Sequence, residues 1–95
     1  MYAVKLSRWV RELCKTLPPE IKREARESLK ELAADPFVGK PPERELAGSY
    51  SLRFMRYRII YKIDAVQKRV TVTGIGHRSS IYETMTKLIR ERMEQ

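Results

Sequence analysis

The spacing of the apolar residues changes along the chain, and this change limits the fold more than any other feature. In the first third they recur at helical spacing, whereas from residue 50 they alternate with polar residues. The first pattern gives a helix one apolar stripe, and the second gives a strand one apolar face. The positions at helical spacing are Trp9, Val10, Leu13, Cys14, Leu17, Ile21, Ala25, Leu29, Leu32 and Ala33. Helices followed by strands predict an α+β fold.

Turn signals divide the first half into a strand, two helices and a loop. Residues 2–6 alternate as a short strand does, and Ser7 stands where it can cap the helix that follows. Pro18-Pro19 ends that helix, because proline disfavours helical geometry in the residue before it, and proline suits the first turn of the next helix. Asp35-Pro36 ends the second helix, and residues 39–48 are typical of a loop. A helical hairpin is therefore predicted.

Three successive strands are predicted in the second half, over residues 50–54, 57–63 and 69–73, from alternation and β-branched residues. Residues 64–68 suit a hairpin loop, whereas Met55-Arg56 is poor turn chemistry. Antiparallel order is the simplest arrangement. Ninety-five residues build one core. We therefore expect a single domain over residues 1–95, with an N-terminal strand, a helical hairpin packed on a small antiparallel sheet, and a C-terminal helix.

The two faces of this sheet differ in chemistry, because successive side chains of a strand point to opposite faces. One face is apolar and lies under the helices; in the middle strand it carries Tyr57, Ile59, Tyr61 and Ile63. Arg58 and Lys62 share the other face, and Arg53 joins them if the strands align. We expect this second face to be basic.

The charge of the chain favours a polyanionic partner, with nucleic acid as the first candidate. The net charge is +8, of which residues 1–48 carry +2 and residues 49–95 carry +6. Cys14 is the only cysteine, which excludes an intrachain disulfide, and no paired Cys or His ligands predict a metal site. No long apolar run predicts a membrane span. We expect a soluble, cytoplasmic protein without a metal or other cofactor.

The junction GHRSSIY, residues 76–82, has features of a phosphate site. Ser80 and Glu83 have capping-box spacing, so a helix begins at or near Ser80 and Tyr82 lies in its first turn. Unpaired N–H groups there favour anions, and Arg78 just before the helix can bind phosphate with two parallel bonds. Glycine, a capping serine and an aromatic residue are also common at ordinary strand-to-helix turns. The motif alone leaves both interpretations open.

The last helix carries an apolar stripe formed by Ile81, Met85, Leu88, Ile89 and Met93. Such a stripe either packs on its own domain or is covered by a partner protein. We favour packing on the domain.

The order of these elements, with the stretches YSLRF, RYRIIYKID, VTVTGIGHR and IYE, resembles the RelE/ParE toxin superfamily over almost the entire chain. The resemblance, with the RelE branch favoured, implies a toxin of a type II toxin–antitoxin pair that inhibits translation. Such a toxin is an endoribonuclease that enters the ribosomal A site and cuts mRNA without a metal, by attack of the 2′-hydroxyl on the adjacent phosphate. It also implies a cognate antitoxin with an acidic, amphipathic segment.

The resemblance assigns catalytic roles to Arg53, Arg58, Arg78 and Tyr82. We expect Arg56, Lys62 and His77 to contact RNA, although a strand lysine such as Lys62 is as often simply solvated. His77 should point away from Arg78 if the last strand runs through both.

The chain departs from the family pattern at Ser51, where relatives often have a basic residue, so a lysine that could act as a general base is absent. Glu43 and Glu45 are candidates for a carboxylate base, as in one branch of the family. Two other functions stay open: a ParE-like inhibitor of DNA gyrase, and an RNA-binding toxin homologue without catalysis.

Overall fold

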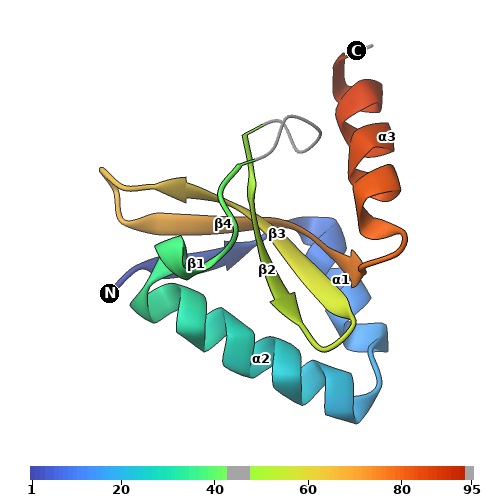
Figure 1. Cartoon of the computed structure of the whole chain (residues 1–95), viewed down its shortest axis with the longest axis horizontal. Helices are drawn as coiled ribbons and strands as arrows, with labels where there is room; N and C mark the ends of the chain where they lie inside the picture. The colour runs from blue at the N-terminus through green and yellow to red at the C-terminus, as the bar shows by residue number, and fades with distance from the viewer. Residues whose placement is uncertain (43–47, 94–95) are drawn as a thin grey trace.

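The computed structural model describes residues 1–42 and 48–93, which form three α-helices and a four-stranded sheet (Figure 1). The order along the chain is β1 (Ala3–Leu6), α1 (Arg8–Thr16), α2 (Pro19–Ala34), the 3-10 turn η1 (Pro36–Val38), β2 (Tyr50–Phe54), β3 (Tyr57–Asp64), β4 (Arg69–His77) and α3 (Ile81–Met93). The α+β class and the order of elements predicted from the sequence are confirmed. None of the described helices is long and apolar enough to cross a membrane.

The sheet has the strand order β1-β4-β3-β2 and is mixed. β2, β3 and β4 pair antiparallel, as predicted. β1 instead pairs parallel with β4, with Ala3 opposite Arg69 and Leu6 opposite Val72. The sequence predicted this first strand but not its place in the sheet. It runs parallel to β4 because the helical hairpin and β2 and β3 intervene before the chain returns beside it in the same direction.

Local signals explain most boundaries. Ser7 precedes α1 in extended geometry and its carbonyl accepts from Arg11 N, but its buried hydroxyl makes no capping bond. α2 begins at Pro19, as the proline pair predicts. The β2–β3 pairing forms despite its poor turn chemistry, with Met55 in the left-handed region at φ 51°. Of the predicted loop, Lys40 pairs with Ser51.

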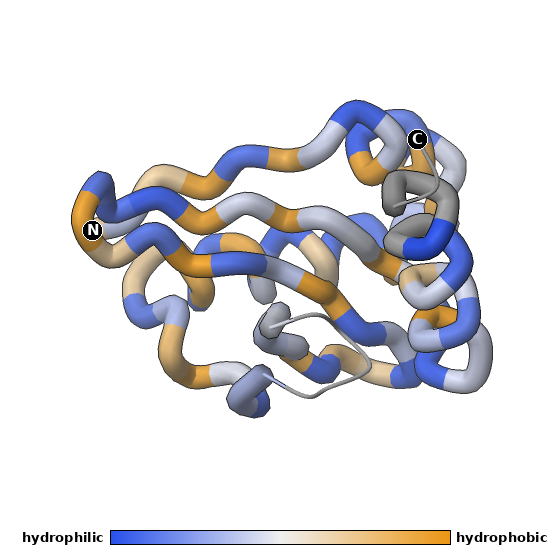
Figure 2. Tube along the Cα trace, turned by 90° about the horizontal axis from the view of Figure 1, so that it is seen from above, coloured by the Kyte–Doolittle hydropathy of each residue, from blue (hydrophilic) through white to orange (hydrophobic). Residues whose placement is uncertain are grey.

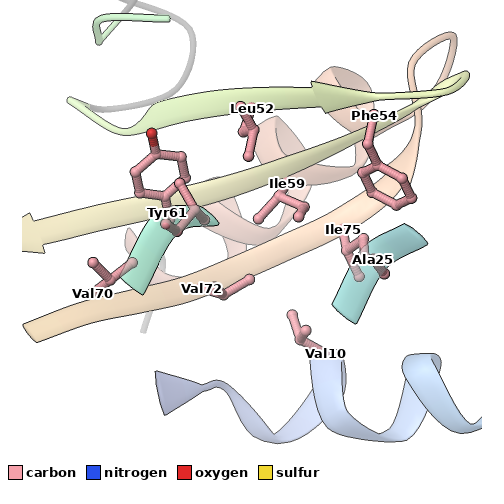
Figure 3. Close-up of a cluster of buried hydrophobic side chains, with 10 residues drawn as sticks. Val10, Ala25, Leu52, Phe54, Ile59, Tyr61, Val70, Val72 and Ile75 are labelled. Carbon is pink, nitrogen blue, oxygen red and sulfur yellow. The ribbon is translucent and has the colours of Figure 1, made fainter. Parts of the chain in front are cut away.

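The main core lies between the helical hairpin and one face of the sheet (Figure 3). Its buried members are Val10, Ala25, Leu32, Leu52, Phe54, Ile59, Tyr61, Val70, Val72 and Ile75. Tyr57 and Ile63 pack against it, so the face predicted to lie under the helices is confirmed. Apolar and polar residues alternate along the strands in Figure 2, as this one-sided core requires.

β4 is longer than predicted and contains an irregularity that changes its alternation. Tyr61 pairs with Val72, but the preceding residue Ile60 pairs with Gly74, so Thr73 is an extra residue in β4. A bulge of this kind shifts the side-chain alternation by one. Val72 and Ile75 therefore face the same core although three positions separate them.

The opposite face of the sheet is not uniformly basic, which corrects the prediction from parity. Ile60 is fully buried there and forms a second apolar cluster with Ile81 and Met85 of α3. Trp9 packs against both clusters, and its Nε1 donates to Thr73 O at 2.9 Å. The predicted packing of α3 on its own domain is confirmed for Ile81 and Met85; the side chains of Leu88, Ile89 and Met93 lie outside the described part.

Candidate active site

Four arginines approach one another at the end of the sheet where β2 turns into β3. Arg53 and Arg58 are direct cross-strand partners, and Arg56 lies in the turn between them. Arg78 follows β4 directly, and its N–H donates to Arg56 O at 2.8 Å. Strand register and this backbone bond therefore bring together four of the basic residues selected from the sequence.

Arg58 and Tyr82 are in direct contact on the face opposite the helical hairpin. The Arg58 Cζ lies 5.6 Å from the centroid of the Tyr82 ring, a cation–π geometry that contributes about 0.5 to 2 kcal/mol. Arg58 is half-buried, and its Nε is buried with no hydrogen-bond partner within the described residues. An unpaired buried donor costs about 1 to 3 kcal/mol. Such a group in a folded protein calls for an explanation, such as a bound water, a bound anion or a catalytic role.

The charge arrangement at this end of the sheet favours an anion. Arg53 and Arg58 carry the same charge and lie directly opposite each other, which destabilises a pair of strands. Among the described residues, ion pairs occur at Glu12–Lys15 and Glu27–Lys30, both on the helical hairpin. A phosphate near the two guanidinium groups would relieve their repulsion through charge-assisted bonds.

Lys62 and His77 do not join this group. Lys62 shares the face of Arg58 but pairs with Thr71 four positions further along β3, about 13 Å away at the usual rise per strand residue. His77 pairs with Tyr57 on the hairpin side, with the two ring centroids 5.8 Å apart. Its Nδ1 accepts from Ser79 N at 3.2 Å and lies 2.7 Å from Ser79 Oγ. His77 is therefore the last residue of β4, and its side chain bonds to the turn that follows.

The helix N-terminus differs in detail from the prediction. α3 begins at Ile81, and the carbonyl of Ser80 accepts from Thr84 N, which agrees with the predicted start. The Ser80 hydroxyl donates to His77 O at 3.5 Å, so it bonds toward the preceding strand. β4 ends at His77, so the strand does not run through Arg78 as the expected His77 orientation assumed.

The residues considered as a general base or as metal ligands do not extend the candidate active site. Ser51 is buried in β2 and exchanges two backbone bonds with Lys40. Glu43 and Glu45 lie outside the described residues. Within the described part of the chain, no group of three His, Cys, Asp or Glu side chains is placed to hold a metal ion.

Two glycines that were not predicted as functional from the sequence, Gly74 and Gly76, face α3 from β4. A Cβ on Gly76 would lie 3.0 Å from Ile81 Cδ1, and one on Gly74 would lie 2.5 Å from Met85 Sδ. Two glycines at alternate positions of a predicted strand were the available signal, because glycine in a strand often marks close approach of another element.

Comparison with known proteins shows the family of this chain. Residues 3–82 match the family described as the ParE toxin of the type II toxin–antitoxin system parDE. Toxin RelG of Mycobacterium tuberculosis is 37% identical over 83 residues, which cover 85% of this chain and 95% of that protein.

Solved structures share the fold. The toxin in the RelBE2 toxin–antitoxin complex of Mycobacterium tuberculosis superposes with a TM-score of 0.73 at 37% identity, over 81% of this chain and 98% of that one. The isolated E. coli RelE toxin gives a TM-score of 0.70 over 94% of this chain and 99% of that one, at 19% identity, which shows likeness of fold alone. The fold, the family match and the identity to a known toxin together place this chain in the RelE/ParE superfamily of type II toxin–antitoxin toxins.

Proposed function

We propose that this toxin is a metal-independent, ribosome-dependent mRNA endoribonuclease. The observation that carries the proposal is the contact between Arg58 and Tyr82, beside the cross-strand Arg53 and at the end of the sheet from which Arg78 emerges. A guanidinium with a buried, unpaired Nε next to a phenol supplies groups that a phosphodiester transition state needs.

The reaction begins with attack of a ribose 2′-oxygen on the adjacent phosphorus, which forms a pentavalent phosphorane with extra negative charge. The bond from phosphorus to the 5′-oxygen then breaks as that oxygen takes up a proton from water, leaving a 2′,3′-cyclic phosphate and a 5′-hydroxyl. In this proposal Arg58 and Arg78 stabilise the charge on the phosphorane, and Arg53 holds the backbone on the leaving side. Arg56 and Lys62 contribute charge to RNA binding, and we assign no catalytic role to His77.

The proton leaving the 2′-hydroxyl needs an acceptor, and Ser51 removes one basic residue that relatives often have. The Tyr82 hydroxyl is the candidate proton acceptor, because its ring contacts Arg58. Its ring also offers a surface on which a base can stack, worth about 1 to 3 kcal/mol.

Mapping of mRNA 5′-ends on ribosomes after brief induction tests the function. We expect new 5′-ends with the wild-type protein, and a loss of about 10²- to 10³-fold in cleavage rate for Arg58→Ala or Arg78→Ala, because each removes a group that stabilises developing charge. Arg23→Ala, on the exposed side of α2, is the matched control and should cleave at the wild-type rate. No new 5′-ends with wild-type protein would refute the proposal.

Tyr82→Phe separates the two roles of Tyr82, because phenylalanine keeps the ring over Arg58 and loses the hydroxyl. If the hydroxyl accepts or relays the proton, single-turnover cleavage should fall by about 10²-fold or more. Cleavage at the full rate would assign Tyr82 to stacking alone.

Inhibition of DNA gyrase is the second candidate, favoured by the match of residues 3–82 to the ParE toxin family. It does not need the arginines and Tyr82 to act on one phosphodiester. A supercoiling assay with purified gyrase, run beside the 5′-end mapping, distinguishes the two functions.

The cognate partner in this proposal is an antitoxin with an acidic, amphipathic segment that covers the basic end of the sheet. The RelBE2 structure from Mycobacterium tuberculosis and the intact E. coli RelBE structure are both toxin–antitoxin complexes, which supports such a partner here. The net charge of +8 suits an acidic one.

A further inference from the structure

Gly74 and Gly76 lie at alternate positions of β4, on the sheet face that α3 covers. Because glycine lacks a side chain, β4 presents bare backbone to α3 at both positions. Glycine in a strand interior destabilises the fold by about 0.5 to 1 kcal/mol relative to alanine. Positive φ does not explain them, because Gly48 is the only glycine with positive φ among the described residues. The remaining explanation is space.

The first two turns of α3 occupy that space. A Cβ on Gly76 would lie 3.0 Å from Ile81 Cδ1 and 3.6 Å from Ile81 Cβ, and Ile81 is only 2% exposed. One turn further along the helix, a Cβ on Gly74 would meet Met85 Sδ, the flexible part of a long side chain. The two sites therefore differ: Met85 can move its sulfur aside, whereas Ile81 is confined and contacts residue 76 with its Cβ as well as its Cδ1.

Gly76 also lies beside the candidate active site. It is the cross-strand partner of Arg58, and Ile81 immediately precedes Tyr82, whose ring contacts the Arg58 guanidinium. Displacement of Ile81 by a few tenths of an ångström moves the start of α3 and with it the Tyr82 ring. The position of that ring over Arg58 thus depends on an absent side chain at residue 76.

We propose that Gly76 is a positioning residue, which sets the Tyr82 ring over Arg58 by allowing Ile81 to lie against the bare backbone of β4. Its consequence for catalysis rests on the function proposed above. The placement of the ring is independent of that function and can be measured without RNA.

A double-mutant cycle tests the link, because Ile81→Val removes Cδ1, the atom nearest to the added methyl of Gly76→Ala. The first measurement is the NMR shift of the Arg58 side-chain Nε–H and δ-protons, which the Tyr82 ring current displaces; Tyr82→Leu gives the value without a ring. We expect Gly76→Ala to move these shifts toward the Tyr82→Leu values by clearly more than the measurement error. Gly76→Ala combined with Ile81→Val should return them to wild type.

Gly74→Ala is the matched control, since it adds the same methyl to the same strand face and should leave the Arg58 shifts unchanged. The second measurement is the rate of mRNA cleavage on ribosomes. It should fall about 10-fold in Gly76→Ala and recover in the double variant, which a general loss of stability would not produce.

The outcomes separate the two proposals. The Arg58 shifts can move in Gly76→Ala and recover in the double variant while the wild-type protein cleaves no RNA. That result supports the positioning of Tyr82 by Gly76 and refutes the endoribonuclease. Unchanged Arg58 shifts in Gly76→Ala, or shifts that Ile81→Val fails to restore, overturn the positioning role whatever the activity.

Should Gly76→Ala not fold alone, the comparison is made within Ile81→Val. There Gly76→Ala should keep the wild-type shifts, and Gly76→Val, which adds methyls beyond Cβ to the side of β4 that Ile81 contacts, should move them. The reverse pattern refutes the proposal.

Discussion

Tyr61 places a polar hydroxyl group inside the apolar main core. Its side chain is fully buried in the main core (Figure 3). Its hydroxyl donates to Pro36 O at 2.7 Å, which joins the middle of the sheet to η1. Burial raises the pKa of the Tyr61 phenol from 10.0 to about 12, because the ionised form loses its hydration there. The alternation of residues 57–63 predicted the burial, but the bond to Pro36 depends on a loop that the sequence does not place.

Tyr61→Phe should lower the free energy of unfolding at pH 8 by about 1 to 2 kcal/mol, because the buried carbonyl of Pro36 loses its donor. The wild type should then lose this advantage at high pH. A phenol with a raised folded-state pKa contributes stability below the unfolded-state pKa near 10 and loses it as the pH rises through about 12.

Urea unfolding at pH 8 and pH 11 measures both effects. Between these values the wild type should lose about 1 kcal/mol more than Tyr61→Phe. Tyr50→Phe, a half-buried tyrosine stacked on the same ring, is the control and should change stability by less than about 0.5 kcal/mol. An equal pH dependence in wild type and Tyr61→Phe would contradict the assignment.

At the scale of elements, the sequence predicted those parts that regular periodicity and prolines specify. The helical hairpin follows from helical spacing and Pro18-Pro19, and the antiparallel order of β2, β3 and β4 follows from short connections. The parallel pairing of β1 was not predictable in this way, because it depends on contacts between residues far apart in the chain. The bulge at Thr73 was not predicted either, because one extra residue shifts the alternation of side chains from which the two faces were assigned.

The candidate active site was predicted in part from the sequence. Arg53, Arg58, Arg78 and Tyr82 came from a family resemblance, and the strand register then explains why Arg53 and Arg58 are neighbours. The role of Gly76 was hidden, because the space that it leaves has meaning only once α3 lies against β4.

The docking of α3 gives a prediction at this scale. Met85→Ala should lower the free energy of unfolding by about 2 to 3 kcal/mol, because Met85 is 5% exposed and its loss leaves a cavity beside Ile60. Trp9, the only tryptophan, packs against the same cluster, so its fluorescence should report the change.

Urea unfolding followed by Trp9 emission measures this effect. Lys87→Ala, two residues along on an exposed position of α3, should stay within about 0.5 kcal/mol of wild type. A Met85→Ala variant as stable as Lys87→Ala would show that α3 contributes little to the fold.

At the scale of the whole molecule, both faces of the sheet carry an apolar cluster, and the four arginines of the candidate active site lie at one end of the sheet. The helical hairpin covers one face, and α3 covers part of the other (Figure 1). Strand register and a backbone bond place the four arginines at the end of the sheet near the start of α3. The net charge of +8 is therefore not spread evenly. Composition predicted the polyanionic partner class, whereas only the register locates the charges.

This distribution predicts the salt dependence of RNA binding. Arg53→Gln and Arg56→Gln should each reduce the slope of log K against log salt by about 0.7 for a short single-stranded RNA, because each removes one phosphate contact. Fluorescence anisotropy over a salt series measures the slope. Arg23→Gln on α2 should leave it unchanged, and equal slopes for all three variants would place RNA elsewhere on the surface.

The pairing of β1 with β4 has a consequence for how the toxin is made. Ala3 finds its partner at Arg69, so the first strand to leave the ribosome waits for one of the last, and local contacts alone do not complete the sheet. Arg78 and Tyr82 emerge later still. A nascent or truncated chain therefore carries the basic residues without their assembled geometry, and the candidate active site is complete only after each molecule is finished.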